Sequence, residues 1–244
     1  MKNKINFYKD RVSLNVLAKD INNAKEIIDA TEGNVIVGVL SKNFATTKDA
    51  VLEMNKWKDE TENRISVGLG AGDPKQSYMV AEIVKEINPA HANQVFTGVG
   101  LTVNNYNNKE TFINCLCSPS GKPGYVVIST GPLSSNEEKA VVPIKTAIQM
   151  IKDMGGDSIK FFPMKGLSTI EEYKIVAKAC AENDFALEPT GGIDLDNFKE
   201  ILKIALDAGV NKIIPHVYNS IIDENGNTNI DKTKILFNII KELV

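Results

Sequence analysis

Residues 158–164, SIKFFPM, place one lysine inside an apolar run. If this run is a strand, the alternation of its side chains puts Ser158 and Lys160 on the same side. An ammonium group that is buried between strand and neighbouring elements loses hydration, and its pKa falls toward the range of a nucleophilic amine. Lys160 is therefore a candidate nucleophile. A lysine that reaches solvent or forms a salt bridge at the strand end is the structural alternative.

A glycine pair ends the next predicted strand, in the order Thr190, Gly191, Gly192. Two glycines allow the backbone to approach a ligand closely, and a helix N-terminus beyond them presents unpaired N–H groups that suit a phosphate. Barrels often hold phosphate after strands seven and eight. A tight turn between strand and helix also needs glycine, so this pattern gains its weight from Lys160 one βα unit upstream.

Taken together, the two segments resemble the 2-keto-3-deoxy-6-phosphogluconate aldolases. The motifs are IKFFP at residues 159–163 and PTGGI at residues 189–193, separated by one helix. Over nearly its whole length the chain is most similar to the branch called KDGP aldolase, which is associated with D-glucosaminate catabolism. The resemblance implies a class I barrel enzyme in which Lys160 forms the Schiff base and residues 190–192 belong to the pocket for a phosphorylated substrate.

The chain departs from the wider family in its acid/base. That family carries a glutamate on strand two, whereas residues 35–40 are VIVGVL here. Glu188 is the first candidate to replace it, because a carboxylate beside the lysine strand could shuttle protons between the substrate hydroxyl and the enamine carbon. A buried salt bridge from Glu188 to a lysine, Lys160 included, is the alternative.

The glycine-rich loop at residues 68–73 is similar to the loop that handles the pyruvate carboxylate in the wider family. It makes Gly70 a candidate binding residue and Asp73 a candidate second carboxylate, although Asp73 equally suits a helix cap. Lys19 and Lys42 follow predicted strands and are candidates to pair with the substrate carboxylate.

Polar groups near the last predicted strand are further candidates. His216 follows that strand directly and could bind phosphate or relay protons, and Ser220 could contact the same phosphate. The side chains of Asn15 and Gln94 are candidates to project into the barrel.

Eight short apolar runs alternate with amphipathic stretches, as expected for repeated βα units. The predicted strands are residues 11–17, 35–40, 65–69, 94–96, 125–129, 158–162, 185–187 and 212–214. Several of these runs are apolar without alternation, as strands buried on both faces are. Eight parallel strands close into a barrel, so we expect residues 1–244 to form a single (βα)8 TIM barrel of the α/β class.

Local signals mark the helices between these strands. Residues 168–171, STIE, have the spacing of a capping box, and the glycines at 155 and 156 should stop the preceding helix. The helix after Ser168 has an apolar stripe at three- and four-residue spacing, which predicts a core face. Its members are Tyr173, Val176, Ala177 and Cys180.

Residues 98–124 form the irregular part of the chain. An asparagine-rich stretch at 104–108 and a possible strand at 111–117 replace a clear fourth helix. An inserted hairpin or an interface arm is expected there.

The composition is that of an ordinary globular protein, with 43% hydrophobic residues, 24% charged residues and a formal net charge of −3. Neither nucleic acid nor a membrane surface is suggested as a partner. No signal-peptide core precedes residue 10 and no stretch reaches the roughly 18 apolar residues of a membrane helix, so we expect a cytoplasmic protein. Because barrels of this kind commonly associate, a homo-oligomer is expected.

The three cysteines are an odd number in a chain too large to need disulfides, so Cys115, Cys117 and Cys180 are expected to be reduced thiols. With two histidines and one CxC pair, the sequence offers no strong metal constellation. Neither a metal nor another cofactor is expected.

The expected reaction is cleavage of 2-dehydro-3-deoxy-6-phosphogluconate to pyruvate and glyceraldehyde 3-phosphate through an imine on Lys160. One alternative is an aldolase for an unphosphorylated keto acid such as 4-hydroxy-2-oxoglutarate, which phosphate dependence would separate. The other is a barrel that binds a phosphorylated metabolite without catalysis, which covalent trapping with pyruvate and borohydride would separate.

Overall fold

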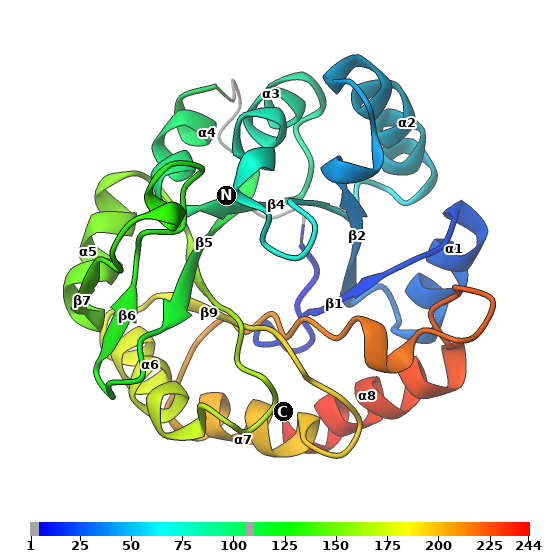
Figure 1. Cartoon of the computed structure of the whole chain (residues 1–244). Helices are drawn as coiled ribbons and strands as arrows, with labels where there is room; N and C mark the ends of the chain where they lie inside the picture. Colours follow the sequence, from blue (N-terminus) through cyan, green and yellow to red (C-terminus); the bar gives the residue numbers. More distant parts are fainter. Residues whose placement is uncertain (1–4, 106–109) are drawn as a thin grey trace.

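The computed structural model describes residues 5–105 and 110–244. Figure 1 shows a ring of strands surrounded by helices. Seven strands of the ring pair in parallel, in the order β1 (Leu14–Leu17), β2 (Val35–Leu40), β3 (Ile65–Gly68), β4 (His91–Val95), β5 (Phe112–Pro119), β8 (Ser158–Phe161) and β9 (Ala186–Pro189).

The ring is closed by the segment that was predicted as the eighth strand. Ile213 bridges in parallel to Val12 and Leu187, and His216 bridges in parallel to Asn15 and Thr190. These bridges are isolated rather than a continuous ladder, and Pro215 between them has no N–H to donate. The predicted (βα)8 barrel is therefore confirmed as a fold.

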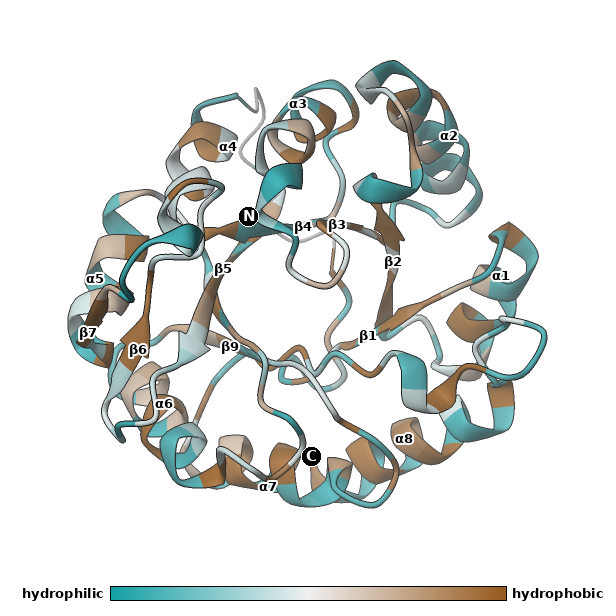
Figure 2. Cartoon of the chain, viewed as in Figure 1, coloured by the Kyte–Doolittle hydropathy of each residue, from teal (hydrophilic) through white to brown (hydrophobic). Residues whose placement is uncertain are grey.

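Eight helices of the described residues cover the outside of the ring. They are α1 (Ile21–Ala30), α2 (Thr47–Glu60), α3 (Ser77–Ile87), α4 (Val99–Asn105), α5 (Ile144–Asp153), α6 (Ile170–Glu182), α7 (Phe198–Asp207) and α8 (Ile230–Leu243). Figure 2 shows that the inner ring of strands is largely hydrophobic, whereas the surrounding helices carry both hydrophobic and hydrophilic residues. The predicted core stripe of α6 is confirmed, since its members are buried and Tyr173 stacks on Phe161 of β8.

Two of the predicted strands were placed wrongly. The fourth was expected at residues 94–96, but β4 begins at His91, because polar residues that face the interior disguise its start. The fifth was expected at residues 125–129, but that run is β6 (Tyr125–Val127), which pairs antiparallel with β5 and with β7 (Val141–Pro143). The true fifth barrel strand, β5, lies in the stretch that was expected to be irregular.

The inserted hairpin exists, but it lies later in the chain than predicted. β6 and β7 form it beyond the carboxyl end of β5. The stretch at residues 98–124 instead contains a short fourth helix, α4, followed by β5, and part of the asparagine-rich stretch, residues 106–108, lies outside the described residues.

The helix-end signals had different outcomes. The capping box was wrong: α6 has Thr169 as its N-cap without a side-chain cap bond, and Ser168 donates its hydroxyl to the carbonyl of Lys165. The predicted glycine stop is confirmed, since α5 ends at Asp153 and Gly155 has a φ of 83°.

An apolar cluster closes the amino-terminal end of the barrel. Its buried members are Ile5, Ile36, Ala90 and Ile214. Polar side chains fill the barrel above this floor, so the interior changes from apolar to polar toward the carboxyl ends of the strands. Among the described residues, no helix is long and apolar enough to cross a bilayer.

Candidate active site

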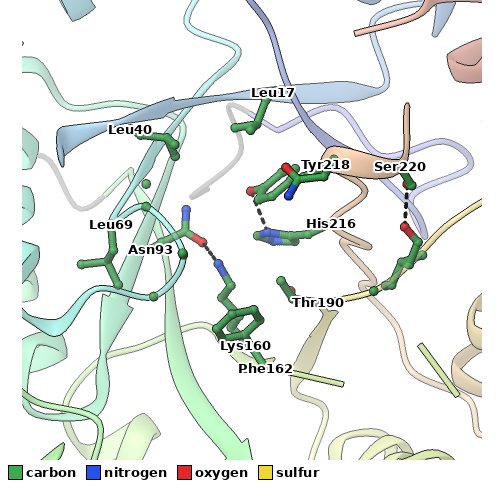
Figure 3. A pocket seen from close by; sticks show the side chains of 18 of the residues that line it. Leu17, Leu40, Leu69, Asn93, Lys160, Phe162, Thr190, His216, Tyr218 and Ser220 are labelled. Atoms are coloured by element: carbon green, nitrogen blue, oxygen red, sulfur yellow. Dashed lines mark hydrogen bonds between the residues drawn. The ribbon is translucent and has the colours of Figure 1, made fainter. Parts of the chain in front are cut away.

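A cavity of about 500 Å³ opens at the carboxyl ends of the barrel strands (Figure 3). This end of a (βα)8 barrel is where catalytic residues gather. Loops after β2, β3, β8 and β9 and the segment after His216 all reach the cavity. The predicted site residues that line it are Lys160, Thr190, Gly191, Gly192, His216, Ser220, Gly70 and Lys42.

Lys160 extends from β8 into this cavity with only 7% of its surface exposed. Its Nζ donates to Oδ1 of Asn93 at 2.8 Å. Burial lowers the pKa of Lys160 to about 8, and the negative charge of Glu188 opposes this shift. The amine is thus partly neutral near physiological pH, which a nucleophilic lysine requires. The two structural alternatives were a lysine that reaches solvent and a lysine in a salt bridge. Lys160 is buried, and the partner of its Nζ is the amide oxygen of Asn93 rather than a carboxylate.

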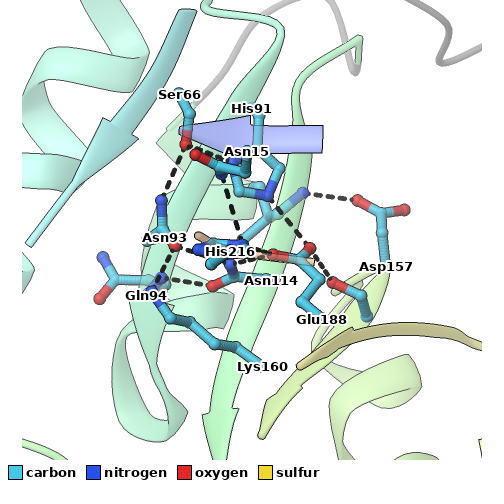
Figure 4. Close-up of polar contacts among 12 residues, drawn as sticks. Asn15, Ser66, His91, Asn93, Gln94, Asn114, Asp157, Lys160, Glu188 and His216 are labelled. Carbon is cyan, nitrogen blue, oxygen red and sulfur yellow. Dashed lines mark hydrogen bonds and ion pairs between the residues drawn. The ribbon is translucent and has the colours of Figure 1, made fainter. Parts of the chain in front are cut away.

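Asn93, on β4, is fixed by a network deeper in the barrel (Figure 4). Its Nδ2 donates to Oγ of Ser66 at 3.0 Å and to the carbonyl of Val67 at 3.1 Å. Its Oδ1 accepts from Nδ2 of Asn114 at 2.8 Å as well as from Lys160. The amide therefore holds its oxygen toward the lysine.

Glu188 lies below the cavity and is fully buried. The carboxylate accepts four hydrogen bonds. The donors are Ser158 at 2.6 Å, Asn114 at 2.7 Å, His216 at 2.7 Å and His91 at 3.1 Å. Burial alone would raise the pKa of Glu188, but the interactions with His91 and His216 outweigh it and hold the pKa well below its usual range. Glu188 is ionised and does not line the cavity, so it faces the substrate only through its neighbours.

His216 connects Glu188 to the cavity. Because an ionised carboxylate only accepts, Nε2 of His216 carries the proton that is shared with Glu188. Burial and the charge of Lys160 lower the pKa of His216 to about 3, so the ring is neutral and its Nδ1 accepts. The partner of Nδ1 is the hydroxyl of Tyr218 at 2.9 Å.

His91, at the start of β4, mirrors His216 on the other side of the carboxylate. Its Nε2 contacts Oε1 of Glu188, and its Nδ1 lies 2.7 Å from Oγ of Ser66. Since both nitrogens are engaged and the ring is 0% exposed, His91 braces Glu188 rather than meeting a ligand.

The turn at residues 190–192 requires glycine for a structural reason, whether or not it binds a ligand. Gly191 and Gly192 have φ values of 102° and 71°, and a Cβ on Gly192 would lie 2.5 Å from the amide of Gly166. The turn therefore packs against the loop after β8. The amides of Gly192, Ile193 and Asn219 donate no hydrogen bond to any residue that the structure describes, and Ser220 donates its hydroxyl to the carbonyl of Ile193 at 2.7 Å.

The helix that was expected to begin directly after this turn begins later. α7 starts at Phe198, and the intervening turn is closed by Asp194, whose Oδ1 accepts from the amides of Asp196 and Asn197. Any anion at this place therefore meets the glycine turn and the loop after His216 rather than the first turn of α7.

Three sequence candidates lie elsewhere. Asp73 does not line the cavity, and its side chain caps a short 3-10 helix by accepting from the amide of Lys75, as the alternative reading of Asp73 required. Lys19 does not line the cavity either, whereas Lys42 does. Gln94 points away from the barrel interior. Its side-chain amide donates to the carbonyl of Ser77, at the start of α3.

Asn15 does project into the barrel, as predicted, and donates to Ser66. Asn93, His91 and Tyr218 were not among the site residues predicted from the sequence. The signal for Asn93 was available, because correct placement of β4 puts residues 91 and 93 on the inner face. Tyr218 follows the closing segment in a loop, where no periodicity indicates direction.

The cysteines are confirmed as free thiols, and all three are buried. Within residues 5–105 and 110–244, no group of three or more histidine, cysteine or acidic side chains is arranged to hold a metal ion.

Residues 8–225 match the sequence profile of KDGP aldolase. The chain belongs to the KDGP aldolase family. A relative from Salmonella typhimurium (strain 14028s / SGSC 2262), named 2-dehydro-3-deoxy-phosphogluconate aldolase, is 49% identical over 246 residues, which cover 99% of each chain.

Solved structures agree with the KDGP aldolase family on the fold. A structure described as native KDPGal has a TM-score of 0.57 at 13% identity and covers 95% of each chain. Phosphoribosylanthranilate isomerase from Thermotoga maritima has a TM-score of 0.55 at 10% identity, with 95% of this chain and 100% of that chain covered. At these identities the likeness concerns the barrel alone.

Proposed function

We propose that this chain is a class I aldolase that cleaves 2-dehydro-3-deoxy-6-phosphogluconate to pyruvate and glyceraldehyde 3-phosphate. One observation carries the proposal: a buried amine, Lys160, is held in the cavity of a chain that belongs to the KDGP aldolase family. The full-length identity to the Salmonella aldolase supports the substrate.

The reaction begins when neutral Lys160, aimed by Asn93, attacks the C2 ketone and water leaves, which forms an iminium. This cation draws electrons from the C3–C4 bond, which breaks as the C4 hydroxyl loses its proton. Glyceraldehyde 3-phosphate departs, and the enamine carbon C3 takes up a proton. Water then hydrolyses the iminium to pyruvate and the free amine.

The substrate phosphate fits the far side of the cavity from Lys160. Gly192, Ile193 and Asn219 line this region, their amides donate no hydrogen bond to any described residue, and a cluster of backbone N–H groups is a common anion site. The Thr190 hydroxyl is directed to the carbonyl of Glu188, so it orders the turn rather than offering its proton.

The substrate carboxylate fits Lys42. This lysine follows β2 and packs over Gly70, where any side chain would collide with it. Lys42 is the other lysine that lines the cavity besides Lys160, so a charge-paired carboxylate at C1 would leave C2 between the two amines.

The test compares kcat/KM for the phosphorylated substrate, its dephosphorylated analogue and 4-hydroxy-2-oxoglutarate. We expect a strong preference for the phosphorylated compound. Equal efficiency on all three would favour the unphosphorylated keto acid, and no cleavage of any would favour a binding protein. Lys42→Met should raise KM for all three substrates, which distinguishes the carboxylate contact from the phosphate contact.

The location, the assembly and the pathway of the protein stay predictions. A phosphorylated substrate and free thiols support a cytoplasmic location, and a role in D-glucosaminate catabolism stays an expectation from the resemblance. The homo-oligomer is tested by light scattering on the purified protein.

A further inference from the structure

The acid/base group of the reaction must touch the cavity, and the candidates there are few. Among the described residues that line it, Asp194 has the one carboxylate, and its Oδ1 is occupied by two turn amides. The hydroxyls of Thr190 and Ser220 are both directed to backbone carbonyls. Glu188, the first sequence candidate, does not reach the cavity.

Tyr218 and His216 remain, and they form a row with Glu188. The carboxylate accepts from Nε2 of His216 at 2.7 Å, and Nδ1 of the same ring lies 2.9 Å from the Tyr218 hydroxyl. Both ring nitrogens are thereby occupied. The hydroxyl is the end of the row that faces the substrate, and Figure 3 shows it at the cavity with its dashed bond to His216.

The row is held in place by its surroundings. Oδ1 of Asn15 lies 3.2 Å from the Tyr218 hydroxyl and is a second, more distant acceptor for its one proton, and Glu188 is fixed by donors from β4, β5 and β8. His216 is 2% exposed, so water does not compete for its proton. A carboxylate behind an imidazole fixes the tautomer and stabilises the imidazolium that forms when the ring accepts a proton.

We propose that Tyr218 is a catalytic residue that exchanges protons with the substrate, and that His216 and Glu188 position and charge-balance it. The proposal rests on the proposed aldolase function. As the C3–C4 bond breaks, the C4 hydroxyl gives its proton to the Tyr218 oxygen, and the Tyr218 proton moves to Nδ1 of His216. The iminium becomes a neutral enamine in the same step, which removes the positive charge at Lys160 that opposes protonation of this ring, and ionised Glu188 balances the imidazolium. The electron pair of the broken bond becomes the enamine.

In the second half of the turnover the protons move in the opposite direction along the row. The imidazolium returns its proton to the Tyr218 oxygen, whose own proton goes to C3 of the enamine. The methyl group of pyruvate therefore receives the proton that left the hydroxyl, or a solvent proton exchanged into the row. No other reactant is needed, and His216 and Tyr218 end each cycle neutral.

The experiment uses Tyr218→Phe, which keeps the ring and removes the hydroxyl. Three quantities are measured: kcat for cleavage, deuterium exchange into the methyl group of pyruvate, and borohydride trapping with pyruvate. We expect the first two to fall by about 10²–10⁴-fold while trapping persists. Trapping also reports that the variant is folded around Lys160.

The matched control is Tyr78→Phe, an exposed tyrosine of α3 that does not line this cavity, and all three quantities should stay unchanged. Methyl exchange near the wild-type rate in Tyr218→Phe would overturn the proposal. Loss of trapping and exchange together would also overturn it, because Tyr218 would then shape the site rather than move protons. Failure of the aldolase function itself would look different, since the wild-type protein would form no adduct.

Discussion

At the scale of single residues, two opposing effects act on the amine of Lys160. Burial disfavours its charge, whereas ionised Glu188 favours it. The sequence contained enough to predict Lys160, because a lysine inside an apolar strand is costly unless it is used. The sequence could indicate that Asn93 faces the barrel interior once β4 was placed correctly, but it could not indicate what Asn93 or Tyr218 does there, since amide and phenol side chains acquire their roles from partners on other strands.

The rate of imine formation with pyruvate should depend on pH through Lys160. Its pKa of about 8 lies below the ordinary value, so the unreactive ammonium form dominates below pH 8 and the amine dominates above it. The trapping rate should therefore rise about tenfold per pH unit below 8 and level off above it. A profile that keeps rising past pH 10 would show that burial does not shift this amine.

Glu188→Gln should move that inflection to lower pH, because the negative charge that opposes the shift is lost. It should also destabilise the fold by about 1–3 kcal/mol, since the amide NH2 would face donors that now point at a carboxylate. Cleavage and methyl exchange should slow while trapping continues.

Thermal melting and the pH profile of trapping are the measurements for this variant. The control is Glu182→Gln on the surface of α6, where we expect neither quantity to change. An unchanged inflection in Glu188→Gln would contradict the electrostatic coupling to Lys160.

At the scale of elements, the period of the hydrophobic pattern predicted most strands but not their partners. β5 (FINCLCSP) has one β-branched residue and β6 (YVV) has two valines, so composition favoured β6 as the barrel strand. Only pairing decides that β5 enters the barrel while β6 joins a hairpin. The start of β4 was predicted three residues too late. Asn93 and Gln94 are both polar although they point to opposite sides, so polarity there does not follow strand alternation. The local signal at Gly155 was reliable because it depends on one backbone angle.

Gly192→Ala tests the fit between the phosphate-side turn and the loop after β8. Its Cβ would lie 2.5 Å from the amide of Gly166, whereas Gly121 has a similar φ of 80° with nothing within 4 Å. Both substitutions carry the strain of a left-handed residue, roughly 1–2 kcal/mol. Gly192→Ala should cost about 1–3 kcal/mol more, because the turn must move.

Urea unfolding of the two variants gives this difference directly. Activity should follow it, with kcat/KM for the phosphorylated substrate reduced in Gly192→Ala and retained in Gly121→Ala. Equal stability of the two variants would show that the turn tolerates a side chain.

At the scale of the whole molecule, the chain length and the alternation of eight apolar runs with amphipathic stretches were sufficient to predict the closed barrel. The organisation along the barrel axis was not predictable, because it depends on which inward residues share a layer. An apolar floor at the amino-terminal end supports a polar layer around Glu188, and that layer supports the cavity. The positive amine and the negative carboxylate thus share one enclosed interior.

Cleavage should survive exhaustive chelation, because the iminium on Lys160 supplies the electron sink that a bound metal supplies in other aldolases. The measurement is kcat before and after treatment with EDTA, followed by addition of Mg²⁺, Mn²⁺ or Zn²⁺. Loss of activity that one of these ions restores would contradict the proposed mechanism.

The most direct test of the central claim is the site of covalent trapping. Wild-type protein is incubated with pyruvate and borohydride, and the intact mass and the modified peptide are determined. We expect one pyruvate per chain on Lys160, and none in Lys160→Arg or Lys160→Met. An adduct on Lys42, or no adduct in the wild-type protein, would contradict the claim that this chain is a Schiff-base aldolase acting through Lys160.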